Sequence, residues 1–382
     1  MSKPIHNSSG SSPSAGFTLV ELMLAMALSL LLFALAFTLV QQLNNTADIV
    51  GSMSDVNENL RAAVNMMSRD LSQAGQNVPL DGIPLPYGGT ATAINRPYPA
   101  GSTFPVPAAG QTLFMPVLTA GNGLGPTQGS GANAINTDVV TMIGVNQFSS
   151  FNQTPVTGSP TVSAGQATIT VSTAAAGYVS PGQLIMLTNS NGSCLLAVSS
   201  VNTSTGVITF THGDSTNDLL GINQFTGPTS GTINQLKTTG SGAWPAIMAY
   251  PITMVTYYLS STTPQRNLMK LTSMGTAGCA LVSCTQVVAL GINVMQIFYN
   301  LSPPATLDGV TSDPTENPWP TASDPGNSPD NIRKVLLTMI AQTDHLNLGT
   351  GQWYSKEIKN AVTIQNLDYY NKYNLGSSMT QN

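Results

Sequence analysis

The hydrophobic and polar positions of the chain follow three successive patterns. Residues 17–40 form an almost unbroken apolar run in which Glu21 is the one charged residue. From residue 43 to residue 71, apolar side chains recur every three, four or seven positions, which is typical of one buried face of a helix. These positions are Leu43, Val50, Met53, Leu60, Val64, Met67 and Leu71. After residue 79, short apolar runs alternate with Gly, Pro, Asn and Ser, as strands and turns do.

The first two patterns together predict one long helix. No proline occurs from Phe17 to Val78, and Gly75 and Pro79 are residues that commonly end a helix. A helix from Phe17 to about Ala74 would be roughly 90 Å long, at ~1.5 Å per residue. Its apolar first part exceeds the ~20 residues that a helix needs to cross a bilayer core. We therefore expect a membrane half followed by an amphipathic half that packs on a sheet.

The third pattern predicts an antiparallel β meander. The first group of strand-like runs covers residues 112–118, 138–145, 167–173, 182–189, 193–201 and 206–211. The second group covers residues 249–260, 267–273, 286–301, 331–343 and 354–367. Residues 80–107 between helix and strands are rich in Pro and Gly and predict a loop region.

The charge of the chain narrows the class of protein. Only 8% of the residues are charged, against about 25% in an average soluble protein, and none is charged from residue 139 to residue 213. Such a composition indicates a secreted, β-rich surface rather than a cytosolic enzyme. Twelve basic and seventeen acidic residues without a basic cluster provide no surface that would bind nucleic acid.

The three cysteines predict one disulfide. Cys279 and Cys284 have four residues between them, which is neither a redox nor a zinc spacing. In an oxidising compartment we favour a disulfide between them over two reduced, half-buried thiols. The remaining Cys194 is expected to be a buried apolar residue.

The residues that carry enzyme or metal chemistry are sparse. The three histidines, His6, His212 and His345, have no metal-binding spacing. Composition leaves a Ser/His/Asp triad open, but no G-x-S-x-G elbow frames a serine, and no glycine-rich phosphate loop is found. We therefore expect no enzyme, no cofactor and no metal centre.

One acidic loop is a candidate for a calcium site. It carries Asp308, Asp313, Glu316, Asp324 and Asp330. Carboxylates in loops suit calcium, but their spacing does not fit the EF-hand pattern. A solvated loop over residues 308–330 is favoured over a calcium site.

The charges around the apolar run predict its orientation. Lys3 and the terminal amine precede it, and the acidic Asp48, Asp55 and Glu58 follow it. This bias places the N-terminus in the cytoplasm and the bulk of the chain outside. A small-residue step lies before the run, at Gly16, rather than after it as in an ordinary secretory signal.

Glu21 has two interpretations. A carboxylate deep in a membrane helix costs roughly 2.5–3.5 kcal/mol. Close to the start of the run it could remain near the lipid headgroups and favour the positive end of the helix dipole. Alternatively, it forms a buried ion pair with a cation on another subunit.

The stretch AGFTLVEL at residues 15–22, followed by the apolar helix, resembles the class III signal of type IV prepilins and type II secretion pseudopilins. The resemblance implies that prepilin peptidase removes a leader, residues 1–16, by cutting after Gly16, and that Phe17 is then N-methylated. It also implies that Glu21 pairs with the N-terminal ammonium of a neighbouring subunit during assembly. The chain would be a single-pass inner-membrane protein before it becomes part of a periplasmic or extracellular pilus.

The order of the remaining pieces resembles the PilW-type minor pilins, beginning with SRDLSQAG at residues 68–75. The implied fold class is α+β and pilin-like, with a long N-terminal helix packed on a large antiparallel β-rich domain. Residues 17–40 would be the transmembrane or pilus-core helix, 41–75 its amphipathic continuation and 76–382 the globular domain. Residues 138–213 would include an inserted small β subdomain.

The expected function is that of a minor pilin that helps to prime or cap a type IV pilus. Long chain length and the absence of a proline within the apolar helix favour a minor over a major pilin. A type II secretion pseudopilin is the first alternative, and a membrane-tethered β-rich adhesin or binding domain is the second. The implied partners are other pilin and minor pilin subunits, the prepilin peptidase and methylase, and the inner membrane, without nucleic acid.

Overall fold

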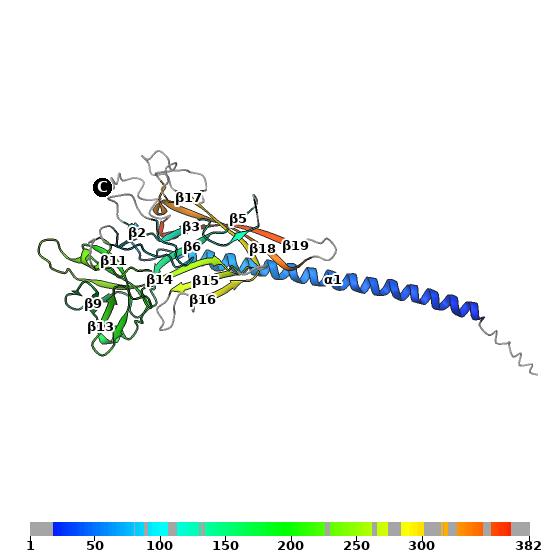
Figure 1. Cartoon of the computed structure of the whole chain (residues 1–382), viewed down its shortest axis with the longest axis horizontal. Helices are drawn as coiled ribbons and strands as arrows, with labels where there is room; N and C mark the ends of the chain where they lie inside the picture. The colour runs from blue at the N-terminus through cyan, green and yellow to red at the C-terminus, as the bar shows by residue number, and fades with distance from the viewer. Residues whose placement is uncertain are drawn as a thin grey trace, which may run out of the picture.

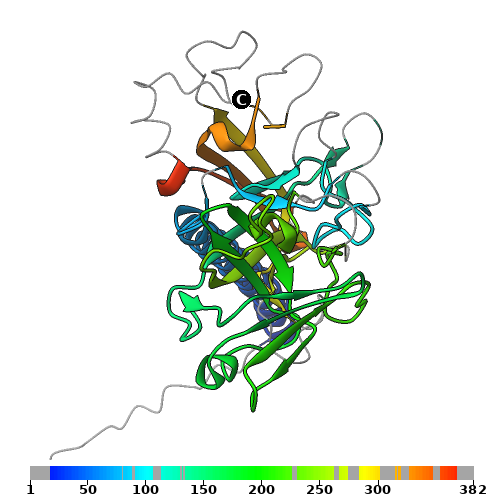
Figure 2. The same ribbon diagram turned by 90° about the vertical axis from the view of Figure 1, so that its left-hand side faces the viewer.

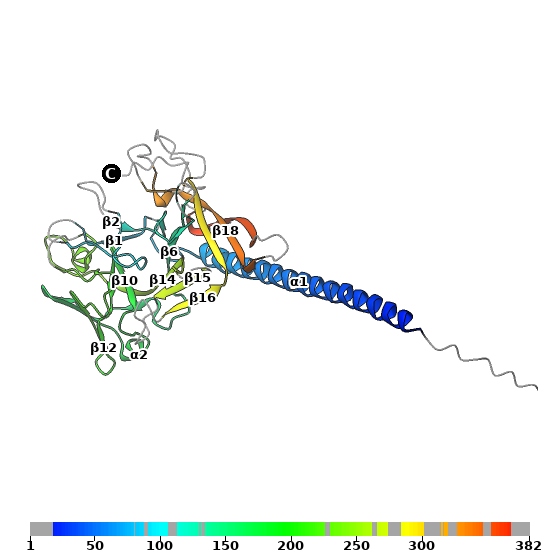
Figure 3. The ribbon, with the colours of Figure 1, turned by 45° about the vertical axis from the view of Figure 1, so that its right-hand side comes forward.

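The computed structural model combines one very long helix with a β-rich globular part at its C-terminal half (Figure 1). It describes residues 18–79, 81–87, 91–105, 113–129, 131, 134–225, 230–261, 266–273, 284–301, 315, 317–319, 327–346 and 353–367. Helix α1 (Leu19–Ser72) projects from the globular part, so that its N-terminal end lies far from every sheet (Figures 1 and 3). The predicted α+β, pilin-like fold class is confirmed.

Helix α1 begins and ends within two residues of the predicted bounds. Thr18 caps its N-terminus and Gln73 caps its C-terminus; the predicted first residue, Phe17, lies outside the described residues. Gly75 follows two positions after the cap with a φ of +76°. A Cβ at Gly75 would lie 2.5 Å from Cγ1 of Val117, so both the left-handed backbone and the close approach require glycine.

The packed face of α1 is shorter than the apolar stripe predicts. Its buried residues are Val56, Leu60, Ala63, Val64, Met67 and Leu71. Leu43 and Val50 belong to the predicted stripe but are 61% and 59% exposed. The prediction that they pack on a sheet is wrong for the single chain, because the globular part begins to cover α1 only beyond them (Figure 1).

The largest sheet has eight strands, and all of its strand pairs are antiparallel. Its main path runs through β11 (Gly192–Ala197), β10 (Leu184–Asn189), β14 (Met248–Leu259), β15 (Leu268–Ser273) and β16 (Thr285–Ala289). Strands β3 (Leu118–Gly121), β6 (Val139–Val145) and β7 (Thr154–Pro155) complete it. The long strand β14 pairs with four of the others, β6, β7, β10 and β15.

A second sheet holds the C-terminal strands β17 (Ile292–Leu301), β18 (Ile332–Leu346) and β19 (Trp353–Thr363) in the order of the chain. Helix α1 packs against β18, β19 and β16, and thus against both large sheets. The view along α1 in Figure 2 shows the strands gathered around this end of the helix. Two further pairs of short strands form separate two-stranded sheets: β1 (Ile83–Leu85) with β2 (Leu113–Met115), and β4 (Thr127–Gln128) with β5 (Ile135–Asn136).

A small four-stranded sheet lies at the end of the molecule opposite the projecting helix (Figure 1). It consists of β8 (Thr161–Val162), β9 (Gln166–Thr170), β12 (Ser200–Asn202) and β13 (Val207–Thr211). The short helices α2 (Thr173–Ala176) and η2 (Ile233–Leu236) contribute buried residues to the same region, whereas η3 (Pro329–Asn331) lies just before β18. Strand β6, which lies within the predicted subdomain of residues 138–213, belongs instead to the eight-stranded sheet. The boundaries of that subdomain stay a prediction.

Two hydrophobic cores meet across β10 and β11. In β10, Leu184 and Met186 face the core that contains α1, while Ile185 and Leu187 face a second core under the small sheet. Successive side chains of a strand point to opposite faces. Both faces are covered here, which explains why the two strands are almost continuously apolar rather than alternating.

A polar contact fixes the C-terminal end of α1 to the eight-stranded sheet. The hydroxyl of Tyr257 in β14 donates to Oδ2 of Asp70 at 2.7 Å, and Lys270 in β15 forms an ion pair with the same oxygen. Burial, together with the neighbouring Asp70 carboxylate, raises the pKa of Tyr257, so the phenol keeps the proton that it donates. The half of α1 inside the globular part is therefore held by specific contacts as well as by apolar packing.

Candidate functional site: the exposed end of the N-terminal helix

The outer half of α1 presents a continuous apolar surface. Every large apolar side chain from Leu19 to Val40 is between 51% and 74% exposed. By length and composition the helix can cross a membrane, and its most apolar window has a mean hydropathy of 2.5 with nothing buried. Soluble monomers rarely expose apolar patches of more than a few hundred Å². This surface therefore requires lipid or another protein.

Glu21 lies in the first turn of α1 and shares a capping box with Thr18. The backbone N–H of Glu21 donates to Oγ1 of Thr18 at 3.3 Å, and Oε2 of Glu21 accepts from both the N–H and the hydroxyl of Thr18 at 3.0 Å. This reciprocal arrangement satisfies donors that the first turn of a helix leaves free. It also fixes the carboxylate at the very tip of the helix.

No cation within the described chain neutralises Glu21. The sequence contains no charged residue from Leu22 to Ala47, about 39 Å of helix at ~1.5 Å per residue. Within the described residues, the donors to this carboxylate are the backbone N–H and the hydroxyl of Thr18. The carboxylate remains able to accept further hydrogen bonds from a positively charged group.

Two of the predicted site residues, Gly16 and Phe17, lie outside the described residues. Cleavage after Gly16 and methylation of Phe17 therefore stay predictions. Sequence reasoning missed the role of Thr18, although the signal was present, because Thr-x-x-Glu ahead of an apolar run is the pattern of a capping box.

The two described cysteines, Cys194 and Cys284, lie away from this helix tip. Cys284 is disulfide-bonded, and Cys194 is a buried free thiol in the second core. Burial raises the pKa of the Cys194 thiol, which makes it unreactive and confirms the expectation of a buried apolar residue. Cys279 lies outside the described residues, so its pairing with Cys284 stays a prediction.

The described residues give no metal-binding cluster of three or more His, Cys, Asp or Glu side chains. Of the acidic span, only Asp330 is described; it lies in η3, and burial raises its pKa to about 6. Asp308, Asp313, Glu316 and Asp324 lie outside the described residues, so the interpretation of that loop as solvated stays a prediction.

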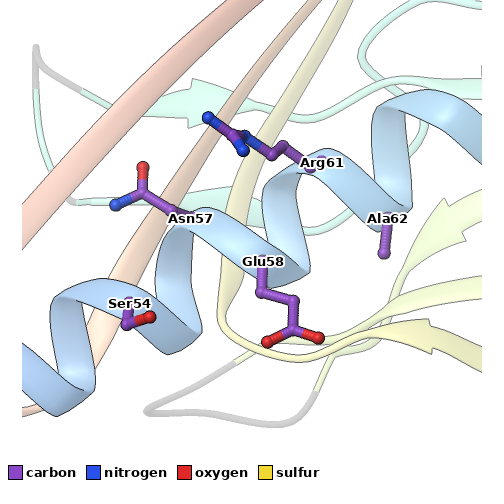
Figure 4. A pocket seen from close by; sticks show the side chains of 5 residues that line it. All are labelled: Ser54, Asn57, Glu58, Arg61 and Ala62. Atoms are coloured by element: carbon purple, nitrogen blue, oxygen red, sulfur yellow. The ribbon is translucent and has the colours of Figure 1, made fainter.

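A second polar feature lies on the part of α1 inside the globular domain. Ser54, Asn57, Glu58, Arg61 and Ala62 line an open hollow of about 590 Å³ on its solvent side (Figure 4). Glu58 and Arg61, three positions apart, belong to the same face of the helix, and their side chains extend in different directions from it (Figure 4). Neither side chain has an ion-pair partner in the described part of the chain.

Comparison with known proteins gives one family match. The model for the prokaryotic N-terminal methylation motif matches residues 11–37, which include Gly16, Phe17 and Glu21. Neither the comparison with curated proteins nor that with solved structures gives a match. The motif implies processing by prepilin peptidase, anchoring of α1 in the inner membrane and assembly with other pilins. The chain thus carries the N-terminal signal of a type IV pilin-like or pseudopilin protein.

Proposed function

We propose that this protein is a minor pilin of a type IV pilus, of the PilW type, which helps to prime or cap the filament. The observation that carries the proposal is the methylation motif at residues 11–37, joined to an α1 surface that is exposed and apolar from Leu19 to Val40. Such a helix serves first as a membrane anchor. It then serves as the packing surface between subunits.

The mechanism begins with a charge made by proteolysis. Cleavage after Gly16 frees the amine of Phe17, which is a cation at neutral pH and remains one after methylation. In the same chain this amine lies one residue before Thr18, whose N–H and hydroxyl already occupy Oε2 of Glu21. The amine of a neighbouring subunit then approaches Glu21, and the two opposite charges neutralise each other in an apolar environment.

Neutralisation makes assembly favourable because an unpaired carboxylate in hydrocarbon costs roughly 2.5–3.5 kcal/mol. The pair also distinguishes processed from unprocessed subunits, since a chain that keeps its leader has no amine at Phe17. The globular part takes no chemical role in this step. It positions the helix, through the Tyr257, Asp70 and Lys270 contacts, and presents its β-rich surface at the filament exterior.

A pseudopilin of a type II secretion system uses the same signal and the same helix. Deletion of the gene in its host separates the two functions. A minor pilin predicts loss of surface filaments with normal secretion of exoproteins, and sheared wild-type filaments should contain the mature chain. Normal piliation with blocked secretion would instead identify a pseudopilin, and the loss of neither would favour a tethered binding domain.

A further inference from the structure

The part of α1 inside the globular domain leaves one face uncovered. Its residues follow two neighbouring rows along the helix, at intervals of three, four or seven positions within each row, and all are exposed. We call this face the open stripe; it consists of Ser54, Asp55, Glu58, Arg61, Ala62, Asn65, Met66 and Arg69. It lies opposite the buried residues of the helix and contains the hollow of Figure 4.

The charges of the open stripe are sorted along the helix. The two acidic residues, Asp55 and Glu58, come first, and the two basic residues, Arg61 and Arg69, follow. Among the described residues, only Arg69 has an ionic contact, at 3.6 Å from Asp70, and its side chain is 68% exposed. The other three charges of the open stripe, Asp55, Glu58 and Arg61, have no ion-pair partner among the residues that the structure describes.

Sorted charges of this kind fit a second copy of the same helix when the two copies are parallel and shifted. Both copies enter the membrane by the same end, so their helices are parallel. Without a shift, Arg61 would face Arg61 and Glu58 would face Glu58, which is unfavourable. A shift brings the basic half of one copy to the acidic half of the other.

The size of the shift follows from the helix tip. If Glu21 of one copy pairs with the amine of Phe17 of the next, the helices are offset by four residues, about 6 Å. In that register Arg61 is level with Asn57 of the neighbour, between the neighbour's Asp55 and Glu58. Arg69 is then level with Asn65, a hydrogen-bond acceptor, and Glu58 with Ser54, a donor.

We propose that the open stripe is a docking face for α1 of a second copy of this chain, parallel and shifted by four residues. The proposal rests on the proposed function, because the tip contact that sets the shift belongs to it. It adds that the globular half of α1 specifies the same register independently, by charge. No residue of the stripe then meets a like charge at its own level.

Cysteine pairs across the stripe test the register. In the four-residue shift, Met66 of one copy is level with Ala62 of the next, and both positions are exposed and uncharged. Two differently tagged full-length copies, one Met66→Cys and one Ala62→Cys, are produced together in the host and oxidised. We expect a crosslinked dimer carrying both tags. Two Ala62→Cys copies, which report an unshifted pair, should crosslink much less.

Charge reversal tests whether the charges of the open stripe hold the two copies in this register. Adding Arg61→Glu to the Met66→Cys copy should lower the crosslink yield about two- to fivefold, the factor expected for one exposed ion pair. Adding Asp55→Lys and Glu58→Lys to the Ala62→Cys copy should then restore the yield. Lys237→Glu, an equal charge change on an exposed residue outside α1, serves as the control and should leave it unchanged.

The outcomes separate this inference from the proposed function. Suppose that the chain is cleaved at Gly16 and is found in filaments. If crosslinking is then strongest between two Ala62→Cys copies, is absent, or occurs only to another protein, the proposed docking of a second copy is wrong, whereas the pilin function stands. The same holds if compensating charges fail to restore the yield. If the chain keeps its leader and never enters filaments, both proposals are overturned.

Discussion

Oε2 of Glu21 accepts two hydrogen bonds from Thr18, one from its backbone N–H and one from its hydroxyl, each at 3.0 Å. The carboxylate that the motif places in the apolar helix is thus held by its own first turn before any partner arrives. The partner has to provide charge rather than hydrogen bonds alone, because Thr18 provides neutral donors.

Glu21→Gln should be cleaved normally but assembled poorly, since the amide keeps the shape and the hydrogen-bonding capacity and loses the charge. Glu21→Ala should behave similarly. We expect at least a tenfold loss of the mature chain from sheared filaments, the factor that ~1.4 kcal/mol represents. Quantitative immunoblotting of filaments and membranes measures it. Thr18→Val, which removes only the hydroxyl, is the control and should lose far less; wild-type incorporation of Glu21→Gln would contradict the ion pair.

Tyr257→Phe should weaken the attachment of α1 to the eight-stranded sheet. The change removes a hydrogen bond to the Asp70 carboxylate and leaves the buried ring in place, so we expect a loss of about 1–2 kcal/mol in the free energy of unfolding. Urea unfolding of the full chain in detergent provides the measurement. Asp70→Ala should cost more, because it also leaves Lys270 without its partner. Equal stability of Asp70→Ala and wild type would show that this contact does not hold the helix.

Periodicity predicted α1 to within two residues and most of the strands, because both depend on local patterns of apolar residues. It wrongly predicted that Leu43 and Val50 are buried. The length of helix that the globular part covers depends on tertiary packing, which the local pattern does not contain. The apolar periodicity assigns no role to Asp70. Its partners Tyr257 and Lys270 lie 187 and 200 positions away, and no local signal connects them. In the candidate site, Glu21 was found by resemblance, whereas the capping role of Thr18 was readable and missed.

Asp218 should make the protein less stable as the pH rises from about 4 to about 6. Its burial raises the pKa from 3.8 to about 6, so the folded state binds the proton more tightly than the unfolded state. Stability from this group is complete below pH 4 and is lost as the pH rises through 6, by roughly 3 kcal/mol. Asp218→Asn should remove that part of the slope in urea unfolding followed against pH.

Asp214→Asn is the matched control for that slope. Although desolvation opposes them, hydrogen bonds from Asn217 and other neighbours lower the pKa of Asp214. Its contribution to stability is therefore present above pH 4 and is lost only at lower pH. A slope between pH 4 and 6 that survives in Asp218→Asn, or disappears in Asp214→Asn, would refute the assignment to Asp218.

Thiol labelling should count one free cysteine, and only after unfolding. Cys194 is fully buried and free, and Cys284 is disulfide-bonded. Iodoacetamide should leave the folded chain unmodified, add one group in denaturant, and add three groups in denaturant with reductant, as counted by intact mass. Three groups in denaturant alone would exclude the Cys279–Cys284 disulfide.

The N-terminus of the mature chain tests the central claim most directly. Intact mass and N-terminal peptide mass of the protein from host membranes should show a chain that begins at Phe17 and carries one additional methyl group on its amine. Loss of the prepilin peptidase should restore the leader, residues 1–16. A chain that keeps residues 1–16 in the wild-type host, or that begins after Ala36, would contradict the account of this protein as a pilin-type subunit.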